Sequence, residues 1–171
     1  MESKPLKSSI DEIDLRLLDL LQADASVANQ DLAAAVGVSP ATALRRVRRL
    51  TDAGLIERRI AILAADKVGG LQALVEVQLD RQGAEHLDAF EAIAVVDAAV
   101  QQCWRTTPGP DFVLVLWVAD MAAYNALVQR LFTQNANVRN VKTFFATRRA
   151  KFEPRIDVGV LRAIDSGSRA P

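Results

Sequence analysis

Only three residues, Gly37 to Ser39, separate two helical stretches of this chain, and so short a turn limits how the flanking helices can pack. Before the turn, Leu32 and Val36 recur at the period of an amphipathic helix. After it, Ser39 is expected to cap a second helix, with Pro40 at the first helical position. A tight turn with glycine between two short helices is typical of a helix-turn-helix.

Three helices are predicted in this part of the chain. The first begins near Ser9, which we expect to be its N-cap, and carries acidic residues in its first turn. The second is expected to be capped by Asn29 and to stop at Gly37, and the third to end before Gly54. Apolar residues of the first helix recur at spacings of three and four: Ile10, Ile13, Leu17, Leu20 and Leu21.

Beyond residue 55 the apolar residues follow other periods. Residues 56–62 alternate, which predicts an extended linker strand over residues 59–70, and Gly69-Gly70 marks the end of that linker. The remainder is predicted as strand, helix, strand, strand, helix, strand, the ferredoxin-like β-α-β-β-α-β order. The expected fold class is therefore α+β. The predicted parts are 8–58 (helix-turn-helix), 59–70 (linker strand), 71–155 (ferredoxin-like domain) and 156–171 (tail).

The third predicted strand, residues 112–118, is apolar on both faces and central in the expected order. Helices cover one face of such a sheet, so an uncovered face this apolar would be a large exposed patch. We therefore expect that face to be buried against another subunit.

Composition excludes several classes of protein. Basic and acidic residues are equal in number, 21 each, so any affinity for a polyanion must be local. With Cys103 as the only cysteine and His86 as the only histidine, neither an intrachain disulfide nor a Cys/His zinc cluster can form. No signal peptide or membrane span is seen, which favours a cytoplasmic protein without a membrane partner. We expect neither enzymatic activity nor a metal or other cofactor.

Arginines concentrate on the third helix. A helical projection places Leu44, Val47, Leu50 and Thr51 toward the other helices. Roughly opposite them lie Thr42, Arg45, Arg46 and Arg49, while Arg48 falls on a flank. Like charges four residues apart on a helix repel each other, so we expect a polyanion to compensate them.

Double-stranded DNA fits this face, because arginine neutralises phosphates and binds guanine in the major groove. A helix that enters the groove by its first turns presents early residues to the bases, with the N-terminal serine near a phosphate. The alternative is a solvated basic face. The candidate DNA-contacting residues are Ser39, Ala41, Thr42, Arg45, Arg46, Arg49 and Arg58.

Three blocks of residues resemble the Lrp/AsnC, or feast/famine, transcription regulators of bacteria and archaea. The first comprises Ile10, Asp11, Asp14, Leu17, Leu18, Leu21, Gln22 and Asp24. The second comprises Leu32, Ala33, Val36, Gly37, Ser39 and Pro40, and the third Arg46, Val47, Arg49, Leu50, Gly54 and Ile56. The similarity extends over roughly residues 10–155, including the strand and helix around residues 110–127.

This resemblance implies a winged helix-turn-helix domain, a linker strand and an effector-binding ferredoxin-like domain. It also implies homodimers that assemble further, often to octamers, with an amino acid or related metabolite bound between dimers. The family's effector loop corresponds to the segment 106–112, in which the glycine stands two residues before the aspartate rather than three. Candidate effector-binding residues are Thr106, Thr107, Gly109, Asp111, Thr143 and Thr147. The alternative is a tight turn in which Asp111 caps backbone N–H groups.

The leading hypothesis is a sequence-specific DNA-binding transcription regulator whose assembly or DNA binding responds to such a metabolite. A DNA-architectural protein with little sequence preference and no effector is the alternative. An enzyme with a catalytic ferredoxin-like half is a third class, but the chain offers no acid–base or nucleophile constellation for it.

Overall fold

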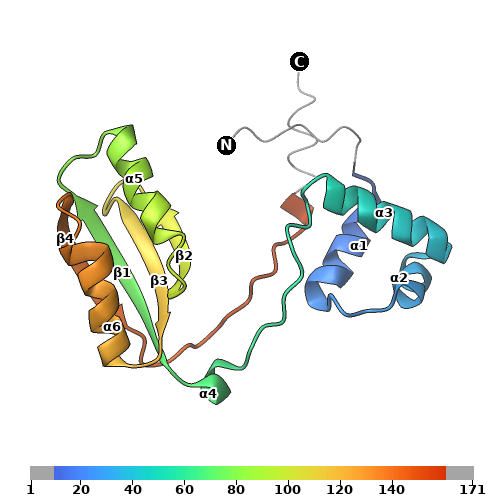
Figure 1. Cartoon of the computed structure of the whole chain (residues 1–171). Coiled ribbons are helices and arrows are strands. Elements are labelled where there is room, and N and C mark those ends of the chain that lie inside the picture. The colour runs from blue at the N-terminus through green and yellow to red at the C-terminus, as the bar shows by residue number, and fades with distance from the viewer. Residues whose placement is uncertain (1–9, 161–171) are drawn as a thin grey trace. The chain divides into compact units, whose positions relative to one another are not determined.

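The computed structural model describes residues 10–160, and the chain divides into two compact units (Figure 1). One unit comprises residues up to Ile62 together with the segment from Phe152 onward, and the other comprises Leu63–Lys151. We call them the helical unit and the sheet unit. Within residues 10–160, the first contains α-helices between residues 12 and 52, and the second a four-stranded antiparallel sheet with its helices, so the predicted α+β class is confirmed.

The helical unit contains α1 (Glu12–Ala23), α2 (Asn29–Val36) and α3 (Pro40–Asp52). Its apolar core gathers residues from all three helices: Leu17, Leu18, Leu21, Leu32, Val47 and Leu50. The periodicity of the sequence therefore located these helices correctly, and the three-residue turn joins α2 to α3.

The caps of these helices follow the sequence only in part. Ser39 is the N-cap of α3, and its side chain accepts a hydrogen bond from the Thr42 N–H, as expected. The N-cap of α1 is Asp11, while Ser9 lies outside the described residues. Asn29 is not the N-cap of α2, because its side-chain amide instead donates to the Pro40 carbonyl at 2.8 Å. That bond ties the start of α2 to the start of α3.

The predicted linker strand over residues 59–70 is not formed. Residues 57–64 are extended but pair with no strand in the described part of the chain, and a single helical turn, α4 (Ala65–Val68), follows them. The alternating pattern was correct about extended backbone and wrong about sheet pairing, because a strand requires a partner.

The sheet unit follows the predicted element order. Its strands are β1 (Leu71–Leu79), β2 (Val100–Arg105), β3 (Phe112–Val118) and β4 (Val138–Phe145). They lie in the antiparallel order β2-β3-β1-β4, which places β3 in the interior of the sheet as predicted. Helix α5 (Ala84–Ala94) follows β1, and α6 (Met121–Leu127) follows β3 and continues as a π-helical turn, Val128–Thr133.

The two faces of this sheet differ in burial. Alternate residues of β1 and β3, such as Val75 and Leu114, are fully buried together with Phe90 of α5 and Leu127 of α6. No helix of the described sheet unit packs on the opposite face. Cross-strand pairing brings six apolar side chains together there, and we call this surface the open face: Leu74, Trp104, Val113, Val115, Trp117 and Phe144.

The chain leaves the sheet unit after β4 and ends in the helical unit. The Gln22 side chain on α1 binds the Ile156 backbone twice, accepting from its N–H at 2.8 Å and donating to its carbonyl at 3.0 Å. Val158 packs against the helical core. The described part of the predicted tail is therefore built into the helical unit.

Candidate functional site

The rotation of α3 about its own axis decides which of its side chains are accessible. Ala43, Val47 and Leu50, at spacings of four and three, form its buried stripe. Leu44 is 41 % exposed, so its predicted place in the interior is wrong. The small Ala43 lies in the interior instead, because close packing between helices admits a small side chain as readily as a large one.

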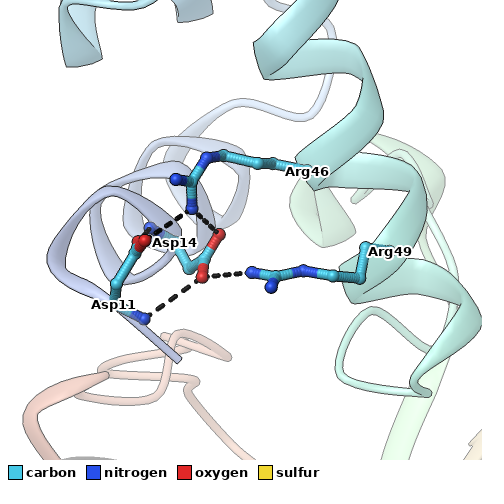
Figure 2. A network of polar contacts seen from close by, with 4 residues as sticks. All are labelled: Asp11, Asp14, Arg46 and Arg49. Carbon is cyan, nitrogen blue, oxygen red and sulfur yellow. Dashed lines mark hydrogen bonds and ion pairs between the residues drawn. The ribbon is translucent and has the colours of Figure 1, made fainter. Parts of the chain in front are cut away.

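Two arginines of α3 are bound to α1 (Figure 2). One terminal nitrogen of Arg46 contacts Asp11 at 2.7 Å and Asp14 at 2.9 Å. Arg49 donates to the other carboxylate oxygen of Asp14. Because Asp14 is fully buried, its charge depends on these two guanidinium groups for compensation.

The same carboxylates also begin α1. Asp11 accepts a hydrogen bond from the Asp14 N–H at 3.0 Å, and Asp14 accepts one from the Asp11 N–H at 3.1 Å, forming a capping box. Hence the start of α1 and the orientation of α3 are fixed by one network of four side chains.

The expectation that Arg46 and Arg49 face outward to DNA is therefore corrected. Their side chains are 22 % and 41 % exposed and are directed to α1. The acids that balance them lie more than thirty residues earlier in the chain, whereas the sequence argument considered only acids on α3 itself. Two aspartates three residues apart at the start of the first helix were the signal that could have revealed the network.

Hydrogen bonds favour the charged forms of Asp11 and Arg46 in this network. Partial burial works against the charge of Asp11, but hydrogen bonds from the Asp14 backbone and from Arg46 outweigh it, so the pKa of Asp11 falls below its ordinary value of 3.8. Hydrogen bonds to Asp11 and Asp14 raise the pKa of Arg46. Since the pKa of Asp11 is lowered by folding, its contribution to stability is present above about pH 4 and is lost in stronger acid.

Other predicted DNA contacts remain accessible. Ser39, Ala41 and Arg45 are exposed and Thr42 is half-buried, so the first turns of α3 bring these four together. The Ser39 hydroxyl also donates to the Thr42 hydroxyl at 2.9 Å. Arg58 is exposed on the extended segment beyond α3, beside Glu57. Arg48, which the prediction placed on a flank, is exposed as well.

In the predicted effector loop, bonds within the sheet unit hold Asp111. Its carboxylate accepts hydrogen bonds from the Leu79 N–H at 2.7 Å and the Gln82 amide at 3.2 Å. The Thr106 hydroxyl donates to the Pro110 carbonyl at 2.5 Å, which closes the turn between β2 and β3. Asp111 thus does cap a backbone N–H, as the alternative interpretation of this loop expected.

The remaining effector candidates differ in accessibility. Thr107 and Gly109 are exposed at the tip of the loop, and Gly109 has a φ of +129° that disfavours other residues. Thr143 lies on β4 and shares a 2.7 Å hydrogen bond with the Tyr124 hydroxyl. Thr147 is exposed beyond the end of β4. The structure therefore brings Thr106, Thr107, Gly109 and Asp111 into one loop, with the other two threonines on a different strand and its extension.

Within residues 10–160, no group of three or more His, Cys, Asp or Glu side chains is arranged to hold a metal ion. Over the same range, no helix is long and apolar enough to cross a membrane.

Two family models divide the chain in the way that its architecture does. A winged helix-turn-helix DNA-binding model matches residues 10–57, which contain α1 to α3. A model of the Lrp/AsnC ligand-binding domain matches residues 72–156, which contain all four strands except for Leu71 at the start of β1.

Individual proteins are similar over nearly the whole chain. The Bkd operon transcriptional regulator of Pseudomonas aeruginosa is 34 % identical, over 82 % of this chain and 93 % of its own length. The leucine-responsive regulatory protein of Rhizobium meliloti is 32 % identical, over 90 % of this chain and 99 % of its own length. The crystal structure of a transcriptional regulator from Neisseria meningitidis in complex with L-Met has 27 % identity and a TM-score of 0.81, covering 90 % of this chain and 99 % of its own.

Fold, helix network and similarity together define a DNA-binding transcription regulator with a separate ligand-binding domain. The chain belongs to the Lrp/AsnC family.

Replacement of Asp14 by alanine should destabilise the helical unit by about 3 kcal/mol, because two arginines lose a buried counter-charge. Asp11→Ala removes an exposed N-cap and should cost about 1 kcal/mol. Denaturant unfolding followed by far-ultraviolet circular dichroism measures both. The only tryptophans, Trp104 and Trp117, lie in the sheet unit, so their fluorescence reports that unit separately. Equal effects of the two substitutions would contradict the central role of Asp14.

Proposed function

We propose that this regulator binds specific double-stranded DNA through α3, senses an amino acid through its sheet unit and acts as a homodimer that assembles further. The observation that carries the DNA part is the exposed, capped start of α3. Ser39 and Thr42 lie there beside Arg45, on a helix whose Arg46 and Arg49 are bound to the aspartates at the start of α1. The proposed contact residues are Ser39, Ala41, Thr42, Arg45 and Arg58, and the place of action is the cytoplasm.

Arg45→Ala should weaken binding to a preferred DNA duplex by about 1–3 kcal/mol and relax preference at one base pair, if Arg45 binds a base. The duplex is obtained by selection from a randomised library, and affinities are measured at fixed salt. Arg16, exposed on α1, supplies the control substitution Arg16→Ala. Equal loss on random DNA would make Arg45 a phosphate contact, and absence of any preferred sequence would favour a DNA-architectural protein instead.

An amino acid is the proposed effector class. One relative is named as leucine-responsive and a structural neighbour was solved with L-Met, and this chain shares their ligand-binding domain. An amino acid offers an ammonium and a carboxylate, which hydroxyls and backbone groups of a loop can bind. The exposed tip of the loop, Thr107 and Gly109, is better suited to direct contact than Asp111, whose carboxylate holds the loop in place. Thr106, Thr143 and Thr147 are the further proposed contributors.

At least one of the standard amino acids should raise the melting temperature of the sheet unit, followed by tryptophan fluorescence. A ligand present at one hundred times its dissociation constant stabilises the native state by about 2.7 kcal/mol. Thr107→Ala should reduce that shift, whereas Thr51→Ala in the helical unit should leave it intact. No shift with any amino acid would exclude this effector class.

A second copy of the chain is the proposed occupant of the open face. Leu74, Trp104 and Phe144 are exposed there, around the half-buried Val115 of the central strand. Identical apolar faces are self-complementary in a twofold dimer, which is the commonest form of homo-oligomer. Glu76 and Lys142 are directly paired across β1 and β4 on the same face and provide it with opposite charges. Association of such dimers into larger assemblies, up to an octamer of four dimers, is part of this proposal.

Leu74→Glu should convert the dimer to a monomer, because it places a charge at the centre of the open face. Light scattering after size exclusion measures the mass. Val96→Glu is the matched control, since Val96 is exposed at the turn between α5 and β2, away from the open face. A wild-type monomer, or a dimer that survives Leu74→Glu, would contradict the proposed interface.

A further inference from the structure

The accessible face of α3 differs from the arginine-rich face that the sequence predicted to be exposed. Five residues with exposed side chains recur at spacings of three, four, seven and eleven from the first: Ala41, Leu44, Arg45, Arg48 and Asp52. At about 100° per residue, they fall within an arc of about 100° on the helix surface. They therefore form one continuous stripe, which we call the reading face.

Leu44 lies within the reading face. It is 41 % exposed, and the apolar core of the helical unit is assembled from other residues. A single exposed leucine is unremarkable on most helices. Here, however, it lies at one edge of the stripe, one residue before Arg45 and one turn before Arg48, on the helix that this fold presents to DNA.

The network around Asp14 maintains this arrangement. Because Arg46 and Arg49 are bound to Asp11 and Asp14, they hold one flank of α3 against α1. Rotation of α3 toward a face centred on Arg46 and Arg49 would break these contacts and leave Asp14 buried without a counter-charge. DNA therefore meets a face on which an apolar side chain lies beside two cationic ones.

In the major groove, the group that an apolar side chain recognises is the 5-methyl of thymine. We propose that Leu44 contacts a thymine methyl group, with Arg45 and Arg48 on adjacent bases or phosphates and with Arg46 and Arg49 outside the contact. This inference rests on the proposed binding of DNA through α3. The inference adds Leu44 and Arg48 to the proposed DNA interface and assigns thymine as the base that Leu44 contacts.

Uracil substitution tests the contact, because uracil lacks only the 5-methyl group of thymine. The probe is the duplex that the full-length wild-type chain selects from a randomised library, with each thymine replaced in turn by uracil. Wild-type affinity should fall about fourfold at the contacted position, the value of one buried methyl-sized group. Leu44→Ala should bind the thymine duplex more weakly and show no further loss on the uracil duplex.

Two controls accompany this experiment. Leu63→Ala removes another exposed leucine, in the other unit, and should keep the uracil sensitivity of the wild type. Arg48→Ala should reduce the slope of log affinity against log salt by about one if Arg48 neutralises a phosphate. Circular dichroism confirms that each variant remains folded.

The inference is overturned if Leu44→Ala stays as sensitive to uracil as the wild type, if no uracil position matters, or if the selected half-sites lack thymine. If one of these results is obtained but Arg45→Ala still weakens binding to the same duplex, DNA binding through α3 is supported and only the assignment of Leu44 is wrong. If no sequence is selected, both fail together.

Discussion

The buried carboxylate of Asp14 is the group on which the arrangement of the DNA-binding unit depends. A charge removed from water must be paired, and here its partners are two arginines of the neighbouring helix. The same side chain closes the capping box of α1, so one group links the beginning of one helix to the rotation of another. The accessible surface of α3 is thus determined from inside the unit, by the buried carboxylate of Asp14.

This arrangement also changes the electrostatic character of α3. Of the four arginines between positions 45 and 49, two are compensated by aspartates of α1. The cationic surplus presented to a polyanion is correspondingly smaller, in a chain whose formal net charge is zero. A moderate surplus limits sequence-independent attraction, which grows with the number of phosphates neutralised. Discrimination then rests on contacts to base edges, as a regulator that must find particular sites requires.

Local patterns predicted most of the fold, since each depends on neighbouring residues. Ser39 and Pro40 predicted the start of α3, and the continuous apolar run of residues 112–118 predicted a central strand. The rotation of α3 was not predictable in this way. That rotation depends on aspartates more than thirty residues distant in the sequence. It also places Ala43 in the interior in place of Leu44, whereas a helical projection favours the larger side chain there. In the same way, the sequence identified Asp111 as a candidate effector-binding residue. It could not predict the bond of Asp111 to the Leu79 backbone, because that bond depends on the pairing of distant strands.

The DNA-binding unit is discontinuous in sequence, because it is formed by residues up to Ile62 and by the segment from Phe152. In topological terms, the sheet unit is an insertion between two segments of the helical unit. The second segment packs on the helices, because Ile156 bonds to Gln22 of α1 and Val158 contacts the helical core. The sheet unit's points of entry and exit are adjacent, because β1 begins where β4 ends and the Ala146 N–H donates to the Gln72 carbonyl. The sheet unit is therefore joined to the helical unit by two chain segments, which leave the sheet side by side at the start of β1 and the end of β4.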